Sequence, residues 1–151
     1  MDLVLWRHCE AAPGLPDEAR PLTPRGVAQA AAMAKWLAAR LPRRCRILAS
    51  PAVRAQQTAR FLARGFETTA DAGTGTTIDA LLDAAGWPDA GQSVVVVGHQ
   101  PTLGRTASRL IDGDDADRVL APGAVCWLTR VAGGSASLHA LVTPDALPAS
   151  R

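Results

Sequence analysis

The stretch VVVVGHQP, residues 94–101, constrains the fold more than any other part of the sequence. Four consecutive valines form a short apolar run with the β-branched composition of a strand that is buried on both faces. Glycine and histidine follow the run, and Pro101 is predicted to begin a helix that ends near Asp112. A buried strand that leads directly into a helix is typical of the parallel sheets of α/β proteins.

The same alternation of strand and helix extends outward along the chain in both directions. A hydroxyl residue followed by proline, at Thr23-Pro24 and at Ser50-Pro51, marks the expected start of two helices. The expected strands cover residues 2–6, 45–49, 66–70 and 93–97, and the expected helices cover 24–41, 51–64, 78–85 and 101–112.

The C-terminal part of the sequence differs from this alternation. Residues 125–131 and 137–142 read as two strands, and Gly133-Gly134 between them predicts a final hairpin. We therefore predict one three-layer α/β domain over residues 1–151, with a mainly parallel central sheet, an antiparallel edge and helices on both faces.

Composition and charge exclude several classes of protein. The chain has 151 residues, 48% of them hydrophobic and 20% charged, with a net charge of +2 that does not demand a nucleic-acid partner. No apolar stretch approaches the roughly 20 residues of a membrane-spanning helix, and the first residues do not resemble a signal peptide. Cys9, Cys45 and Cys126 form no CxxC pair, so we expect a reducing cytoplasm as the location.

Polar residues directly follow three of the predicted parallel strands. Arg7 and His8 follow the first strand, Ser50 follows the second with Arg54 one turn into the next helix, and His99 follows the valine strand. Because the carboxyl ends of parallel strands share one edge of a sheet, we expect these five residues to meet there.

Such a group of residues suits phosphoryl transfer. Two arginines, together with helix N-termini behind Ser50 and His99, would bind a phosphate. A neutral imidazole is a competent nucleophile because its ordinary pKa is about 6.5, and a second imidazole could hold the phosphoryl oxygens. Taken singly, each histidine could be a turn or core residue and each arginine a surface residue, but the convergence favours a site.

Other chemistries find little support in the sequence. A cysteine-dependent phosphatase needs an arginine six positions after its cysteine, where this chain has Leu15, Pro51 and Ala132. There is no GxxxxGK[ST] loop for a nucleotide and no HExxH motif for zinc. The three histidines lack the spacing of metal ligands, so we expect neither a metal nor another cofactor.

Four segments of the chain resemble motifs of the histidine phosphatase superfamily, also called the phosphoglycerate mutase-like fold. They are, in the order of the family, LVLWRHCEA (3–11), RPLTPRG (20–26), SPAVRAQQTA (50–59) and VVVVGHQP (94–101). The short chain, the Glu-Ala after the first motif and the Arg-Pro-Leu-Thr of the second most resemble SixA-like phosphohistidine phosphatases.

The resemblance implies a role for each residue that matches a motif. His8 would be the nucleophile that is transiently phosphorylated, Arg7 and Arg54 would clamp the phosphate, and His99 would be the second histidine of the pocket. The implied substrate is a phosphohistidine on a signalling protein. The alternatives are a broad phosphomonoesterase that acts on a small metabolite or nucleotide, and a catalytically idle phosphate-binding module. The oligomeric state is left open.

The sequence also departs from the family pattern. Cys9 stands where glycine is usual, and a structural small residue is the favoured interpretation. Gln100 stands where asparagine is common. No motif marks a carboxylic proton donor, and the possible ones are Glu10, Glu67, Asp71 and Asp79.

The lack of a marked acid bears on the substrate. An alcohol leaving group needs a proton because its conjugate acid has a pKa near the value of about 15.7 for water. Phosphohistidine releases an imidazole, whose conjugate acid has a pKa of about 6.5, so it needs less help. The missing acid therefore favours phosphohistidine over a phosphomonoester.

Overall fold

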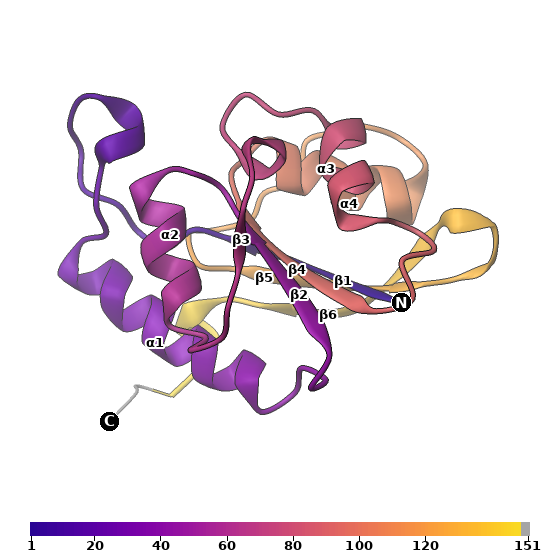
Figure 1. The fold of residues 1–151 in the computed structure, drawn as a ribbon, viewed down its shortest axis with the longest axis horizontal. Helices are drawn as coiled ribbons and strands as arrows, with labels where there is room; N and C mark the ends of the chain where they lie inside the picture. The colour runs from indigo at the N-terminus through magenta and orange to yellow at the C-terminus, as the bar shows by residue number, and fades with distance from the viewer. Residues whose placement is uncertain (149–151) are drawn as a thin grey trace.

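The valine run forms a central strand of a six-stranded sheet. The computed structural model describes residues 1–148, and in it the run is β4 (Ser93–Gly98), between β2 (Cys45–Ala49) and β1 (Asp2–Arg7). Both neighbours are parallel to β4, in the register Val95 with Val4 and with Ile47. The strand order is β3-β2-β4-β1-β5-β6. Figure 1 shows the strands passing between helices that lie on either side of them.

The two edges of the sheet differ. On one side, β5 (Val125–Arg130) and β6 (Ala136–Val142) pair antiparallel to each other, and β5 pairs antiparallel to β1. On the other side, β3 (Glu67–Thr68) is parallel to β2 and has only two residues, fewer than the predicted 66–70. It ends early because the Thr69 hydroxyl accepts the N–H of Asp71 and turns the chain into a short 3-10 helix, η2 (Ala70–Ala72). A mainly parallel sheet with an antiparallel edge is thus confirmed.

Four α-helices of the described residues 1–148 cover the sheet: α1 (Pro24–Ala38), α2 (Val53–Arg60), α3 (Ile78–Ala85) and α4 (Thr102–Asp112). The predicted cap of α1 is confirmed, since the Thr23 hydroxyl accepts the N–H of Gly26 at 2.9 Å. The predicted start of α2 at Ser50-Pro51 is wrong. The Ser50 hydroxyl accepts the N–H of Ala52 in a local turn, and the helix begins after that turn, at Val53.

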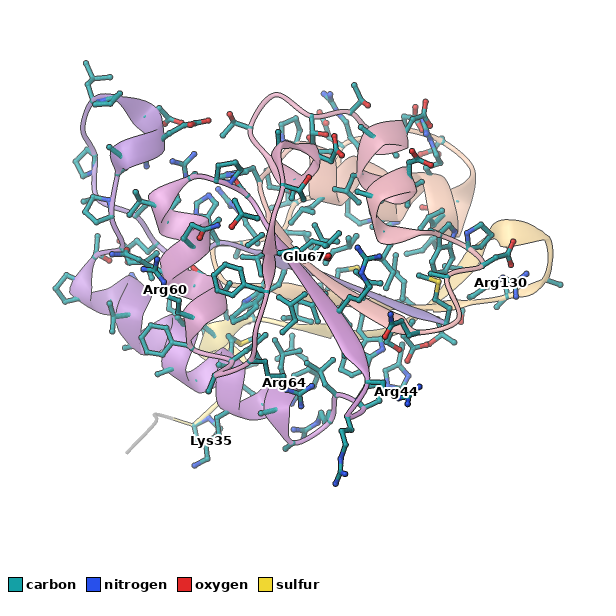
Figure 2. All side chains as sticks on the ribbon, viewed as in Figure 1. Lys35, Arg44, Arg60, Arg64, Glu67 and Arg130 are labelled. Carbon is teal, nitrogen blue, oxygen red and sulfur yellow. The ribbon has the colours of Figure 1, made fainter. Side chains whose placement is uncertain are left out.

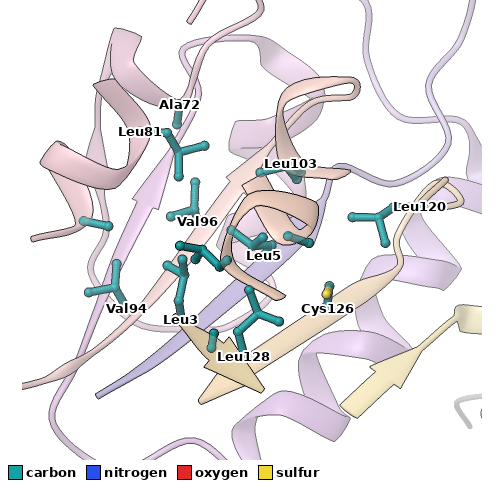
Figure 3. Close-up of a cluster of buried hydrophobic side chains, with 14 of the residues drawn as sticks. Leu3, Leu5, Ala72, Leu81, Val94, Val96, Leu103, Leu120, Cys126 and Leu128 are labelled. Atoms are coloured by element: carbon teal, nitrogen blue, oxygen red, sulfur yellow. The ribbon is translucent and has the colours of Figure 1, made fainter. Parts of the chain in front are cut away.

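Alternate residues of the central strands point to opposite faces, and each face has its own apolar core. Leu3, Leu5 and Val96 pack with residues of α3 and α4, among them Leu81 and Leu103 (Figure 3). On the other face, side chains of β1, β2 and β4 pack against α1 and α2, as Figure 1 shows for the helices. The three-layer arrangement with helices on both faces is therefore confirmed. Within residues 1–148, no helix combines the length and the apolar composition that crossing a membrane requires.

Candidate active site

The carboxyl ends of β1, β2 and β4 bring the predicted polar residues together. Beyond the strands, the N–H of His8 donates to Gly98 and the N–H of Ser50 donates to Val97, each at 3.0 Å, so the three strand ends stay in register. The rings of His8 and His99 lie 5.1 Å apart, and the Arg54 side chain contacts both. The predicted convergence of Arg7, His8, Ser50, Arg54 and His99 at one edge of the sheet agrees with this geometry.

The tautomer of His8 is fixed by its own backbone. Its Nδ1 lies 2.8 Å from the carbonyl oxygen of Cys9, and because a carbonyl only accepts, Nδ1 carries the hydrogen. The lone pair is then on Nε2, which accepts a hydrogen bond from the Nε–H of Arg54 at 3.4 Å. Burial is the main reason that the pKa of His8 is lowered to about 4; the Cys9 hydrogen bond opposes this shift, and the nearby charges of Arg54 and Arg7 add to it. At neutral pH His8 is therefore an uncharged base.

His99 has the opposite tautomer. Its Nδ1 lies 3.5 Å from an Nη2 of Arg54, which can only donate, so Nδ1 accepts and the hydrogen is on Nε2. That N–H donates to the Ser50 hydroxyl at 2.7 Å. Burial, followed by the charges of His8 and Arg54, lowers the pKa of His99 to about 3. The Ser50 side chain thus orients His99.

Two arginines supply positive charge to the pocket. Arg54 is only 4% exposed, and its two Nη atoms donate to the backbone carbonyl of Asp17 at 2.8 Å and to its carboxylate at 3.1 Å. Arg7 donates from Nη1 to the carbonyl of Leu120 at 2.8 Å. Its Nε is buried and has no partner among residues 1–148. This Nε is a donor that an anion in the pocket could satisfy.

The helix amides that were expected to bind an anion are partly occupied. The N–H of Ala52 donates to the Ser50 hydroxyl at 3.1 Å, and the N–H of Gly104 donates to Oε1 of Gln100 at 2.8 Å. Gln100 also donates from Nε2 to the carbonyl of Arg118 at 2.7 Å, so its side chain ties the start of α4 to a neighbouring loop. The positive charge of the pocket therefore comes mainly from the arginine side chains.

Cys9, the residue in place of the family glycine, points away from the pocket. Its side chain is fully buried and packs with Leu22 and Ala30. Its N–H donates to the Thr58 hydroxyl at 3.1 Å, and burial raises the pKa of its thiol to about 12. This geometry agrees with the predicted role as a structural small residue.

Two of the possible acids lie in ion pairs on other parts of the molecule. Glu67 is on the edge strand β3 (Figure 2) and pairs with Arg46 at 2.8 Å. Asp79, in the first turn of α3, pairs with Arg109. Both carboxylates are thus engaged by arginines that are not those of the candidate site.

The other two possible acids are nearer to the loops of the site. Glu10 follows the Arg-His segment, and its carboxylate lies 3.7 Å from Arg25. Asp71 is exposed in the first turn of η2, which packs beside β4.

Asp17 is the carboxylate that does reach the pocket, and sequence analysis did not single it out. It lies in a short 3-10 helix, η1 (Asp17–Ala19), in the loop between β1 and α1. The nearby order of an acid before Arg-Pro-Leu-Thr is the one local hint in the sequence. Its contact with Arg54 depends on how the loop folds back over α2, which no periodicity reveals.

Comparison with known proteins identifies the family. A model of the histidine phosphatase superfamily (branch 1) matches residues 3–75, which hold Arg7, His8, Ser50 and Arg54. An uncharacterized protein of Mycobacterium tuberculosis is 38% identical over 119 residues, and the aligned part covers 73% of each chain. The chain belongs to the histidine phosphatase superfamily.

Solved structures show the same fold for this histidine phosphatase superfamily member. The protein histidine phosphatase SixA complexed with tungstate superposes with a TM-score of 0.85 at 24% identity, covering 97% of this chain and 99% of that one. A structure from Nakamurella multipartitia, assigned to the phosphohistidine phosphatase SixA, has a TM-score of 0.81 at 29% identity and covers 95% of both chains. The phosphoglycerate mutase-like fold is thus confirmed, and membership in the superfamily supports phosphatase activity.

Proposed function

We propose that the chain is a phosphohistidine phosphatase that uses His8 as its nucleophile and forms a phosphohistidine intermediate. The observation that carries the proposal is the state of His8. Its Nδ1–H is held by the Cys9 carbonyl, and its Nε2 lone pair faces the pocket beside Arg54. A neutral imidazole with one unprotonated nitrogen attacks phosphorus without a separate base, once the Nε–H of Arg54 turns from that nitrogen to a phosphoryl oxygen.

The surrounding residues fit the charge of a phosphoryl group in transfer. The unpartnered Nε of Arg7 would donate to its equatorial oxygens. The Nε of Arg54 donates to His8 Nε2 in this structure and would transfer that hydrogen bond to a phosphoryl oxygen when the substrate binds. His99, which is oriented by Ser50, would add a third contact through Nδ1. The negative charge of the bound phosphate would raise the pKa of His99, so that Nδ1 takes up a proton and can donate it in a hydrogen bond to the phosphate.

The reaction then has two balanced steps. In the first, the lone pair of His8 Nε2 forms a bond to phosphorus while the bond from phosphorus to the substrate nitrogen breaks and leaves its electron pair on that nitrogen. In the second, water attacks phosphorus, the electron pair of the P–N bond returns to His8 Nε2, and both protons of the water stay with the released phosphate. The Cys9 carbonyl holds the Nδ1 hydrogen throughout.

A phosphohistidine on another protein is the substrate that this site suits best. Of the four possible acids, Glu67 and Asp79 are held by arginines at other places. Within residues 1–148, neither Glu10 nor Asp71 forms a hydrogen bond or ion pair with the side chains of the two pocket histidines or Arg54, which supports a substrate that needs little acid help. An imidazole needs less help, because the pKa of its conjugate acid is about 6.5. The structural similarity to SixA proteins supports the same substrate class.

Rapid quenching with a labelled phosphohistidine protein tests the proposal. We expect label on the protein that is stable in base and labile in acid, and we expect His8→Ala to abolish it. The variant His139→Ala is the control, because His139 lies on β6 in the C-terminal hairpin and should leave labelling unchanged. Label that survives on the His8→Ala variant would show that another residue is the nucleophile.

The same assay separates the candidate substrates. We expect turnover of phosphohistidine protein well above that of small phosphomonoesters and of p-nitrophenyl phosphate. A preference for a small phosphomonoester would instead identify a broad phosphomonoesterase, and no turnover of any of them would identify a phosphate-binding module.

A further inference from the structure

Asp17 occupies a place in the pocket that the proposed reaction has not used. Its backbone carbonyl and its Oδ2 both accept from Arg54, at 2.8 and 3.1 Å, and its Oδ1 accepts from Arg20 at 2.9 Å. Arg54 comes from α2 and Arg20 from the end of the loop that holds η1. The carboxylate is therefore held from two sides at a fixed place next to the phosphate clamp.

This carboxylate lies on the solvent side of the pocket. The guanidinium of Arg54 lies between His8 and Asp17. The Nε of Arg54 is 3.4 Å from Nε2 of His8, and the Nη2 of Arg54 is 3.1 Å from Oδ2 of Asp17. The His8 residue is 8% exposed, whereas the Asp17 side chain is 53% exposed. Of the two groups that Arg54 joins, Asp17 is therefore on the solvent-exposed side of the site, which we call its mouth. In a phosphoryl transfer the leaving group is in line with the attacking atom and on the far side of phosphorus. A leaving group opposite His8 Nε2 would thus point toward the mouth, where Asp17 lies.

The charge of Asp17 matches one kind of leaving group. Its hydrogen bonds to Arg20, followed by those to Arg54, lower the pKa of the carboxyl group, so it is an anion at neutral pH and does not donate a proton. Phosphohistidine reacts most readily with a proton on its second ring nitrogen, because the ring then leaves as neutral imidazole rather than as an anion. An anion beside that ring stabilises its positive charge. The oxygen of an ester leaving group gains negative charge instead, and the same anion repels it.

We propose that Asp17 determines the leaving-group specificity of the site by accepting the ring N–H of the protonated phosphohistidine at the mouth of the pocket. This inference rests on the proposed function. As His8 Nε2 bonds to phosphorus, the P–N bond of the substrate gives its electrons to the ring nitrogen, and the proton beside Asp17 stays on the other nitrogen of the product imidazole. Asp17 thus favours the reactive protonated substrate without transferring a proton itself.

Asp17→Asn tests the role of the charge. The amide oxygen can still accept from Arg54, while the amide nitrogen replaces the oxygen that accepts from Arg20, so the variant removes the negative charge and the Arg20 contact but keeps the contact with Arg54. We expect kcat/KM on phosphohistidine to fall about tenfold or more, as loss of a close charge interaction in a partly exposed site predicts. Turnover of p-nitrophenyl phosphate, whose leaving group becomes an anion, should stay within about threefold or rise. Glu18→Gln is the control: it removes one negative charge from the exposed neighbour of Asp17 on η1, and it should change neither kcat/KM on phosphohistidine nor turnover of p-nitrophenyl phosphate.

Three outcomes overturn the inference. Equal losses on both substrates would mean that Asp17 only positions Arg54. Gains on both would mean that Asp17 competes with the phosphate for Arg54. Asp17→Glu keeps the charge and serves as the second variant if Asp17→Asn does not fold. If Asp17→Glu loses the preference for phosphohistidine over p-nitrophenyl phosphate, the inference is also overturned. A wild-type protein that hydrolyses p-nitrophenyl phosphate but not phosphohistidine would instead refute the proposed function, and this result is visible before any variant is compared.

Discussion

At the scale of single residues, each imidazole of the pocket has one nitrogen bound to the protein and the other facing Arg54. His8 uses its own backbone at Cys9 as the anchor, and His99 uses the Ser50 hydroxyl. Burial keeps both rings neutral near pH 7, with pKa values of about 4 and about 3. In the proposed reaction the neutral His8 attacks phosphorus, and the neutral His99 takes up a proton when a phosphate brings negative charge.

The carboxylates around the site differ in what they can contribute. Glu67 and Asp79 are in ion pairs with Arg46 and Arg109. Asp17 reaches Arg54 but is held as an anion. The contacts of these three carboxylates are the physical basis for our proposal that the substrate is a phosphohistidine, whose leaving group needs little acid help.

Replacement of the possible acids by their amides tests this preference. We expect each of the four variants Glu10→Gln, Glu67→Gln, Asp71→Asn and Asp79→Asn to lose less than about tenfold in kcat on phosphohistidine, because a positioned general acid contributes about 10² to 10⁴-fold. Arg54→Ala should lose far more, since it removes charge from the transferring phosphoryl group. Steady-state rates on phosphohistidine protein, with circular dichroism to check folding, provide the measurement.

The result could also reverse the substrate assignment. A loss of a hundredfold or more in one folded amide variant would reveal a dedicated acid at that position. A phosphomonoester would then be the better substrate, because only its leaving group depends strongly on such an acid.

At the scale of elements, the first turn of α1 rests on the loop that follows His8. The carbonyl of Glu10 accepts the N–H of Thr23 at 3.0 Å, and the backbone of Gly26 approaches it so closely that a Cβ on Gly26 would lie 2.0 Å from the same oxygen. This close approach explains why the Leu-Thr-x-x-Gly segment ends in glycine. The helix can support the nucleophile loop only if its third residue has no side chain.

Gly26→Ala should therefore destabilise the protein and reduce its activity. The added methyl group must push α1 away from Glu10, and overpacking of this kind costs about 1–3 kcal/mol. We expect a lower midpoint in urea unfolding and a loss of phosphatase activity, because Cys9 and His8 precede Glu10 directly.

Gly65→Ala is the matched control for this variant. A Cβ on Gly65 has no atom within 4 Å among the described residues, so this substitution should stay within about 0.5 kcal/mol of the wild type. Equal unfolding midpoints for the two alanine variants would mean that α1 accommodates the methyl group beside Glu10 without a cost in stability.

At the scale of the whole molecule, the sequence was informative where the sheet determines position. Residues that directly follow parallel strands must lie at one edge, so Arg7, His8, Ser50 and His99 could be predicted to meet without knowledge of any side-chain contact. The layers also followed from the alternation of strand and helix, because each apolar face must be buried.

The features that the sequence did not reveal depend on contacts between loops. The approach of Asp17 to Arg54 requires η1 to pack on α2, and no pattern in the loop indicates this packing. The start of α2 was predicted too early because the Ser50 hydroxyl, which resembles a helix cap in sequence, is used by Ala52 and His99. Local patterns cannot show which of several partners a hydroxyl selects.

The assembled site predicts activity without a divalent metal. Phosphoryl transfer needs positive charge around the phosphate, and here two arginines from β1 and α2 provide it at fixed places. Within residues 1–148, no group of three or more histidine, cysteine, aspartate or glutamate side chains is arranged to hold a metal ion. We expect kcat/KM on phosphohistidine protein to stay within about twofold after dialysis against excess EDTA, and added Mg²⁺ or Zn²⁺ to bring no gain, because metal catalysis would supply charge that the arginines already provide. The Arg54→Ala variant extends the measurement, since its loss should not be restored by either metal. Activity that disappears in EDTA and returns with one divalent metal would show that a cation, and not the pair Arg7 and Arg54, neutralises the transferring phosphoryl group.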